Sequence, residues 1–285
     1  MQALFSGVLV GASYALIATG LAVVFGTMKI INLAHGELVL LGAYIAYTFE
    51  AASGLNPLFA IPLALVVVCI SAGLVHFLVS RIRSDRELNS LILTYGIGII
   101  LTNAVLLIWT ADVRSSNSSW LLEAVMIGPL FSMRSELIGF LLSMLLLGAL
   151  WWWLTRTWYG RALRAVSSDR DAARLMGIDP ARTELLSFVV AGVAAAVAGV
   201  VLYCSSVVQP SLGSALTVKA FIITVLAGVG SIPGVLVGAM LLGVVEALTV
   251  TFYSSALQQL TGMVLFLVVL FVLPNGLFGS AGRRG

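Results

Sequence analysis

The sequence predicts an all-α protein of the polytopic membrane class, with residues 1–285 forming a single transmembrane domain. Hydrophobic residues make up 60% of the chain and charged residues only 9%, whereas a soluble domain is about one quarter charged. The mean hydropathy is +1.11. A soluble protein would have too little polar surface to cover such a core, so we expect much of the apolar surface to face lipid.

Nine apolar segments are the predicted membrane spans. A bilayer core of about 30 Å needs roughly 20 apolar residues at about 1.5 Å each. The segments are residues 4–25, 36–50, 57–80, 88–109, 136–154, 184–206, 217–229, 233–252 and 256–274. The second and the seventh are short and are predicted to be half-helices or tilted partial spans. The expected total is therefore eight or nine crossings.

The arginine distribution predicts the orientation of the bundle. Arginines cluster in loop 81–87, in loop 155–183 and in the tail, which carries Arg283 and Arg284. The long loop 110–135 holds few. The positive-inside rule therefore places loop 81–87, loop 155–183 and the tail in the cytoplasm, and loop 110–135 outside. The parity of the crossings then puts the N-terminus outside, and a cytoplasmic tail favours nine crossings.

Small residues recur at every fourth position in three of the apolar segments. They are Gly7, Gly11, Ala15 and Thr19, then Ala191, Ala195 and Gly199, and finally Gly234 and Gly238. This spacing places them in a stripe on one helix face, where they allow two helix backbones to approach closely. The pattern predicts a tightly packed bundle and indicates no ligand.

Two polar interruptions occur at comparable places in the two halves of the chain. The first is GTMKIINLAHGE, residues 26–37. The second is QPSLGSALTVKA, residues 209–220, and the glycine turn 228–234 follows it. Each interruption adjoins a short apolar segment. Paired breaks of this kind predict pseudo-repeated halves with broken helices and a pathway near the middle of the membrane.

Five polar residues at or near membrane depth are the candidates for a substrate pathway: Asn32, His35, Glu37, Lys219 and Glu246. Burying an ionisable group in a membrane costs roughly 3 kcal/mol, so such a group faces a cavity or a partner. For the two glutamates and the lysine, an interhelical ion pair or a snorkelling side chain is the open alternative. A hydrophobic zwitterion would need a few polar groups for its charges and small apolar walls for its side chain.

A cytoplasmic loop, residues 156–182, is far longer than a turn between two antiparallel spans requires. Ser168 or Asp169 is expected to cap a short helix within it. That helix would expose Leu175 and Met176. Exposed apolar side chains of this kind favour docking to another protein, while a helix lying among lipid headgroups is the open alternative.

Three strings of the sequence resemble the branched-chain amino acid permeases of ABC importers. They are INLAHGELVLLGAYIAY (31–47), SSDRDAARLMGIDPARTELLSFVVAGVAAAVAG (167–199) and GVGSIPG (228–234). The resemblance extends from Gly7 to Gly276. It implies the fold of an ABC importer permease, in which this chain is the membrane-spanning subunit.

The resemblance also implies partners. Such permeases pair with themselves or with a second, similar permease, bind two cytoplasmic ATPase subunits and receive cargo from a periplasmic solute-binding protein. The long cytoplasmic loop would be the coupling region that seats in a groove of the ATPase. The coupling residues it implies are Arg164, Ser168, Asp169, Arg170, Asp171, Leu175, Met176 and Gly177.

The expected function is the translocation of branched-chain, hydrophobic amino acids across the bacterial inner membrane by a multi-pass protein. Two alternatives stay open. Related permeases serve urea or short amides, and nothing in these residues excludes such cargo. A secondary amino-acid transporter driven by an ion gradient would also suit broken helices and a buried Glu246.

The sequence predicts no catalytic residues, no metal site and no cofactor of its own. The lysines are Lys29, after Met28, and Lys219, after Val218, so neither follows the glycine that a phosphate-binding loop needs. ATP is therefore expected to bind to partner subunits. His35 and Glu37 do not form the HExxH pattern of zinc proteases, and no cationic stripe suggests nucleic acid.

Overall fold

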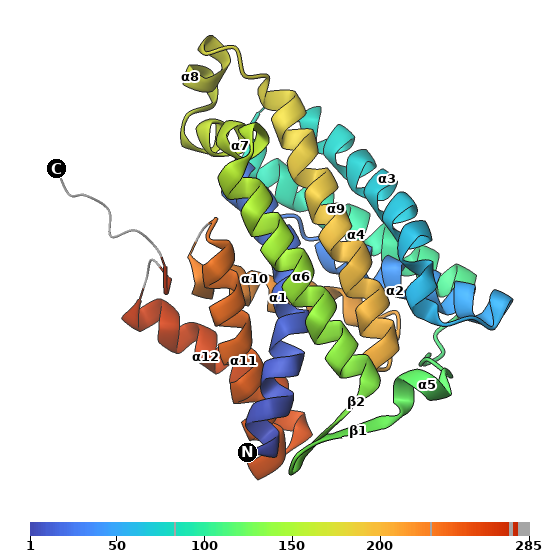
Figure 1. Cartoon of the computed structure of the whole chain (residues 1–285). Helices are drawn as coiled ribbons and strands as arrows, with labels where there is room; N and C mark the ends of the chain where they lie inside the picture. The colour runs from blue at the N-terminus through green and yellow to red at the C-terminus, as the bar shows by residue number, and fades with distance from the viewer. Residues whose placement is uncertain (83, 229, 274–275, 279–285) are drawn as a thin grey trace.

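The computed structural model describes residues 1–82, 84–228, 230–273 and 276–278, which fold into a bundle of long helices (Figure 1). The long helices of the first half are α1 (Gln2–Met28), α2 (His35–Ser53), α3 (Ile61–Ser80), α4 (Arg86–Trp109) and α6 (Arg134–Arg156). Those of the second half are α9 (Pro180–Ser205), α10 (Leu212–Ala227), α11 (Ile232–Phe252) and α12 (Gln258–Val272). The shorter elements are η1 (Pro57–Ala60), α5 (Ser119–Leu122), β1 (Ala124–Ile127), β2 (Leu130–Met133), α7 (Trp158–Ser168), α8 (Arg170–Leu175) and η2 (Ser255–Leu257).

Among the described residues, seven stretches of helix are long and apolar enough to cross a membrane. They are Gln2–Met28, Pro57–Ser80, Arg86–Trp109, Arg134–Arg156, Pro180–Ser205, Ile232–Phe252 and Ser255–Val272. They coincide with seven of the nine predicted segments. The other two segments form α2, whose 19 residues cover about 28 Å, and α10, whose 16 residues cover about 24 Å, against a bilayer core of about 30 Å. Because both begin inside the bundle, we call these two shorter helices half-helices. The expected eight or nine crossings are compatible with this arrangement.

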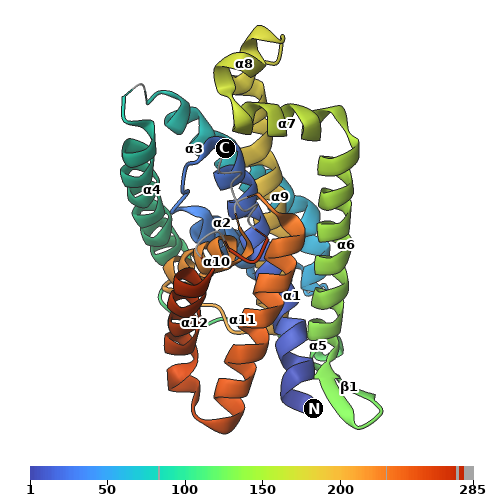
Figure 2. The same ribbon diagram turned by 90° about the vertical axis from the view of Figure 1, so that its left-hand side faces the viewer.

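Helices α2 and α10 begin inside the bundle rather than at its ends. His35, the first residue of α2, lies 2.8 Å from the carbonyl oxygen of Ile17, which is about 16 Å along α1 from the end of that helix. Gly213 in the first turn of α10 packs against Glu37 in the first turn of α2. The N-termini of the two short helices therefore meet in the interior, and α10 lies near mid-height in both views (Figures 1 and 2).

The two short helices leave this meeting point in opposite directions. Near the end of α2, Glu50 accepts hydrogen bonds from Ser116 at 2.9 Å and from the backbone N–H of Asn117 at 3.2 Å. Beyond α10, Gly230 packs on Gly26 near the other end of α1. A long helix followed by a half-helix thus occurs twice with opposite direction, as α1–α2 and α9–α10. The broken helices predicted from the paired interruptions are confirmed.

The two ends of the bundle carry different elements. The start of α1 lies beside the β1–β2 hairpin, and Gln2 donates a hydrogen bond of 2.7 Å to the carbonyl of Phe131. Helices α7 and α8 and the connection from α3 to α4 lie at the opposite end (Figures 1 and 2). Loops 81–87 and 155–183 therefore share one end and loop 110–135 the other, as the arginine pattern predicts. Arg83, Arg283 and Arg284 lie outside the described residues.

The predicted small-residue stripes lie where helices touch. A Cβ on Gly7 would come within 2.6 Å of the Cα of Val244, so α1 and α11 are in backbone contact. A Cβ on Gly199 would come within 2.1 Å of the carbonyl oxygen of Val39, which joins α9 to α2. Helices α1 and α9 are deeply buried, whereas α4 and α12 expose most of their apolar side chains. The exposed helices therefore form the outer faces of the bundle.

Candidate functional site

The five predicted pathway residues fall into two groups in the structure. Asn32, His35 and Glu37 surround the start of α2, while Lys219 and Glu246 come together from α10 and α11. In the first group, Oδ1 of Asn32 accepts the backbone N–H of Ala34 at 3.1 Å and so shapes the turn that leads into α2. His35 makes its described contact with the backbone of α1. Asn32 and His35 therefore fix the helix break.

Glu37 lies where the N-termini of α2 and α10 meet. It is 5% exposed, and a Cβ on Gly213 would overlap its carboxylate, which brings the carboxylate against the first turn of α10. Thr217 accepts the N–H of Gly36 at 2.9 Å and donates to the carbonyl of Leu33 at 3.2 Å, which ties the two helix starts together. The positive ends of two helix dipoles thus stabilise one buried carboxylate. Among the described residues, its Oε2 has no hydrogen-bond partner.

The second group is a polar cluster of Tyr14, Lys219, Glu246 and Gln258, contributed by α1, α10, α11 and α12. Lys219 Nζ donates to Oε2 of Glu246 at 2.8 Å and to the hydroxyl of Tyr14 at 2.7 Å. Tyr14 and Gln258 donate to the same carboxylate oxygen at 2.9 and 2.7 Å. Glu246 is 2% exposed. The contact between the two charged residues is the interhelical ion pair that the sequence left open.

Sequence reasoning missed Tyr14 and Gln258. Tyr14 stands in a continuous apolar run, and Gln258 stands at the boundary of a span, where polar residues are common. Neither position carries a pattern of its own. Their part in the cluster follows from the packing of α1 and α12 around the pair.

The loop predicted to be cytoplasmic, residues 156–182, folds into α7 and α8. Asp169 rather than Ser168 caps α8, because its Oδ1 accepts the backbone N–H groups of Asp171 at 3.0 Å and Ala172 at 2.9 Å. Gly177, with φ of +82°, follows the end of the helix. The predicted short helix is present, and α7 before it is an additional helix that the sequence reading did not separate.

Helix α8 projects from the end of the bundle (Figures 1 and 2) and carries the two apolar side chains that the sequence singled out. Leu175 is 89% exposed and Met176 is 82% exposed. Around them, Arg170, Asp171 and Arg174 border a shallow pocket with the start of α9. An apolar tip ringed by charges is a surface suited to contact with another protein.

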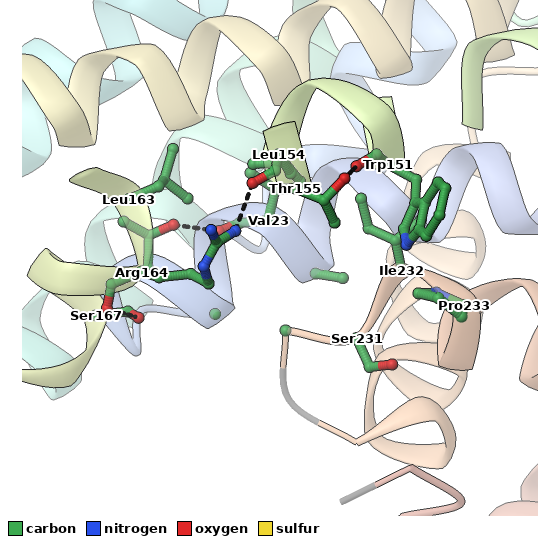
Figure 3. A pocket seen from close by; sticks show the side chains of 14 residues that line it. Val23, Trp151, Leu154, Thr155, Leu163, Arg164, Ser167, Ser231, Ile232 and Pro233 are labelled. Carbon is green, nitrogen blue, oxygen red and sulfur yellow. Dashed lines mark hydrogen bonds between the residues drawn. The ribbon is translucent and has the colours of Figure 1, made fainter. Parts of the chain in front are cut away.

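Helices α7 and α8 together form an arm at the end of the bundle. Arg164 on α7 joins this arm to the bundle. Its guanidinium donates to the carbonyl of Leu154 at the end of α6 (Figure 3). It borders a cavity of about 230 Å³ that is lined from α1, α6, α7 and the start of α11, including Gly26 and Ser231. Helix α7 and the glycine turn that follows α10 therefore line the same cavity.

A buried carboxylate also joins the arm to the bundle, and sequence reasoning missed it. Glu184 in the first turns of α9 is 2% exposed. Arg86 at the start of α4 donates to both of its oxygens, at 3.1 and 2.8 Å, and Arg170 of α8 approaches Oε1 at 3.2 Å. In the sequence Arg86 was only a charge of a loop predicted to be cytoplasmic, and Arg170 was an implied coupling residue with no assigned partner. The structure links α8, α9 and α4 through this one side chain.

A bundle of apolar helices with two half-helices meeting inside it defines an integral membrane permease. The chain belongs to the family of permease components of branched-chain amino acid transport systems, whose sequence profile matches residues 3–273. It is thus a multi-pass protein of the bacterial inner membrane.

Named relatives cover nearly the whole chain. The high-affinity branched-chain amino acid transport system permease protein LivH of Salmonella typhimurium is 32% identical over 98% of this chain and 95% of its own length. BraD of Pseudomonas aeruginosa, which carries the same description, is 33% identical over 98% of this chain and 95% of its own.

A solved structure, PsaBC from Streptococcus pneumoniae in complex with Fab, resembles this chain in fold. The TM-score is 0.53 at 14% identity, and the alignment covers 96% of this chain and 93% of that one. At this identity the likeness concerns the fold alone.

Proposed function

We propose that this chain is the membrane-spanning permease subunit of an ABC importer and moves branched-chain amino acids into the cell. The family match over residues 3–273 carries the proposal. The two half-helices that meet inside the bundle support it, because they bring polar groups to membrane depth without exposing helix ends to lipid.

The chain would supply the passage and leave ATP hydrolysis to two separate ATPase subunits. Helix α8 offers the docking surface, with Leu175 and Met176 at its tip and Asp169, Arg170 and Asp171 beside them. Arg164, Ser168 and Gly177 would hold the arm in shape. On this proposal the permease is no enzyme and holds no cofactor. ATP binding and closure of the ATPase pair would move the arm, and the bundle with it.

The predicted pathway residues would act in two places. Asn32, His35 and Glu37 shape the helix break at mid-depth, and Lys219 and Glu246 present opposite charges between α10 and α11. A solute that passes between these groups meets a polar surface in an otherwise apolar bundle. This combination of polar and apolar surface supports the transport of a solute that carries charges on a hydrophobic body.

The exposed apolar faces of α4 and α12 suit a second permease subunit, either a copy of this chain or a similar chain. A periplasmic solute-binding protein would dock at the end that carries the β1–β2 hairpin, opposite to α8. We expect no nucleic acid partner. Urea or short amides are the alternative cargo, and an ion-driven secondary transporter is the alternative mechanism.

The test is solute uptake by the complete importer in liposomes, with ATP enclosed. Leucine should accumulate only when ATP, both ATPase subunits and the binding protein are present, and a proton uncoupler should leave the rate unchanged. Uptake of leucine by the permease alone would rule out the importer mechanism, and uptake of urea in preference to leucine would rule out the substrate.

The docking surface is tested by the double variant Leu175→Ala/Met176→Ala. It should lose copurification with the ATPase and lower leucine uptake about tenfold or more, because exposed apolar side chains are the anchors of such contacts. Met126→Ala is the matched control for copurification with the ATPase, since Met126 is 83% exposed at the other end of the molecule. Normal assembly and uptake in the double variant would contradict the coupling role of α8.

A further inference from the structure

Three members of the polar cluster, Lys219, Glu246 and Gln258, border a cavity of about 270 Å³ between α10, α11 and α12. Together with Ser255 and Gln259 they form the polar part of its wall. The rest of the wall is largely apolar and includes Leu212, Val218, Ile222, Leu242 and Met263. The cavity therefore has one polar and one apolar region.

The hydrogen bonds of the cluster are unevenly distributed. Oε2 of Glu246 accepts three donors, from Tyr14, Lys219 and Gln258. Oε1 of the same carboxylate is buried and has no partner among the described residues. The ammonium of Lys219 donates two hydrogen bonds in the structure, whereas an ammonium carries three donors. Each ion of the pair thus keeps unused capacity for a group of opposite charge.

The contribution of this ion pair to folding stability does not explain its presence. A buried ion pair costs about as much desolvation as it returns in attraction, and well-packed apolar residues serve the same place equally well. Here the pair also leaves one carboxylate oxygen unsatisfied beside a cavity. That combination is typical of a site that binds a ligand rather than of a structural contact.

We infer that this cavity is a transit site for the zwitterion of an aliphatic α-amino acid, an inference that rests on the proposed function. The α-carboxylate of the solute binds the ammonium of Lys219, and its α-ammonium binds Oε1 of Glu246. The aliphatic side chain lies against Leu212, Ile222 and Leu242. The ligand thus uses the free oxygen of Glu246 and the remaining donor of Lys219, while the contact between Lys219 and Oε2 of Glu246 stays in place.

The size of the cavity supports this ligand class. Pockets for drug-sized molecules are about 300–1,000 Å³, so about 270 Å³ suits a smaller solute. A neutral amide of the urea class carries no charge to complement Lys219 or Oε1 of Glu246, and it has no hydrophobic body to cover the apolar wall. The site therefore favours a small zwitterion with a hydrophobic body.

Helix α12 is placed to open the site. Of the residues described in α12, Gly262 alone is buried, and a Cβ there would lie 3.4 Å from Oε1 of Glu246 and 3.3 Å from Leu242. The free oxygen is thus covered by one glycine of a lightly packed helix. A small outward movement of α12 uncovers it without separating α10 from α11.

The test uses the complete importer with its binding protein and ATPase subunits in liposomes. The variant Lys219→Met/Glu246→Gln removes both charges together, so neither is left buried and unpaired. Leucine uptake should fall about tenfold or more, because both charge contacts are lost. Copurification with the ATPase and ATPase activity in detergent should stay near those of the wild type. Thr224→Val, buried on α10 and bonded to the carbonyl of Ala220, is the control and should transport normally.

A second variant keeps the charges and narrows the cavity. Val218 is 42% exposed and lines the cavity, so Val218→Trp adds volume without disturbing the core. It should lower leucine uptake more than alanine uptake, changing the ratio of the two rates about tenfold, as steric exclusion from a pocket does. A purely structural pair would leave that ratio unchanged.

The outcomes separate this inference from the function on which it rests. If the wild-type importer takes up no leucine, the proposed function is ruled out. Wild-type uptake with normal uptake in Lys219→Met/Glu246→Gln, or with an unchanged leucine-to-alanine ratio in Val218→Trp, overturns the transit site and leaves the importer standing.

Discussion

At Gly199, an added Cβ would lie 2.1 Å from the carbonyl oxygen of Val39, so α9 and α2 touch through their backbones. Gly36 is equally confined, since its Cβ would meet the carbonyl of Gly213 at 2.0 Å. Backbone cannot move aside as a side chain end can. Single glycines therefore hold the half-helix α2 against α9 on one side and α10 on the other.

Gly199→Ala should destabilise the protein by about 1–3 kcal/mol, because overpacking forces the two backbones apart. The measurement is the thermal unfolding midpoint in detergent. Gly73→Ala in α3 is the matched control, because a Cβ there meets nothing within 4 Å. It should be neutral or slightly stabilising, by up to about 1 kcal/mol, since alanine favours helix. Equal midpoints for the two variants would contradict this account of α2 packing.

Single residues also mark the limit of prediction from the sequence. The four-residue spacing of Gly7 and Gly11 identified a packing face, but the partner of that face, α11, came only from the structure. Lys219 and Glu246 were recognised as costly in a membrane, yet they stand 27 positions apart in the chain and are paired only by the packing of α10 against α11. The role of Glu184 was not predictable, because a carboxylate at a loop boundary carries no pattern that indicates Arg86 and Arg170 as its partners.

Among the elements, α8 is linked to the bundle through Glu184. Arg170 of α8 and Arg86 of α4 share this buried carboxylate, which itself belongs to α9. Further along α4, the hydroxyl of Thr94 accepts the backbone N–H of Leu33 at 3.1 Å, just before α2 begins. A displacement of α8 is thus connected through α9 and α4 to the segment that enters α2.

Glu184→Gln should weaken the mechanical link without removing the docking surface. We expect the leucine transported per ATP hydrolysed to fall about fivefold or more, the size of a typical coupling free energy, while the ATPase still copurifies. Arg182→Gln is the control, because Arg182 pairs with Asp179 while its side chain is 87% exposed and contributes little. An unchanged transport ratio in Glu184→Gln would show that α8 acts through other contacts.

Element boundaries show where sequence patterns are informative. The helix breaks before α2 and α10 were predictable because polar and glycine-containing strings interrupt apolar runs at matching places. The division of the long loop into α7 and α8 was not, because Ser168 and Asp169 are both good capping residues. Only the described hydrogen bonds of Asp169 identify the cap.

At the scale of the whole molecule, the hairpin β1–β2 and the arm α7–α8 lie at opposite ends (Figure 1). The arginine pattern predicts that the arm lies in the cytoplasm. The likeness to a solved structure at 14% identity shows that the overall fold tolerates wide variation in sequence. The division into two ends and the helical bundle were therefore predictable, while the depth at which α2 and α10 begin needed the three-dimensional structure.

Cysteine labelling in intact cells tests the orientation. In a chain whose Cys69 and Cys204 are replaced by alanine, Met126→Cys should react with a membrane-impermeant maleimide added outside. Met176→Cys should react only after the membrane is opened. Both side chains are more than four-fifths exposed, at 83% and 82%. A difference in labelling between them therefore reports the side of the membrane on which each lies. The reverse pattern would contradict an outward hairpin and a cytoplasmic arm.

The half-helices have a consequence for how the chain is made. The first turns of α2 and α10 carry backbone N–H groups that hydrocarbon cannot satisfy, and neither helix offers an apolar stretch long enough to enter lipid alone. The first turn of α2 can form its contacts with α9 and α10 only after these two helices have been synthesised. Insertion of this protein is thus expected to finish late, when segments nearly two hundred residues apart close on each other.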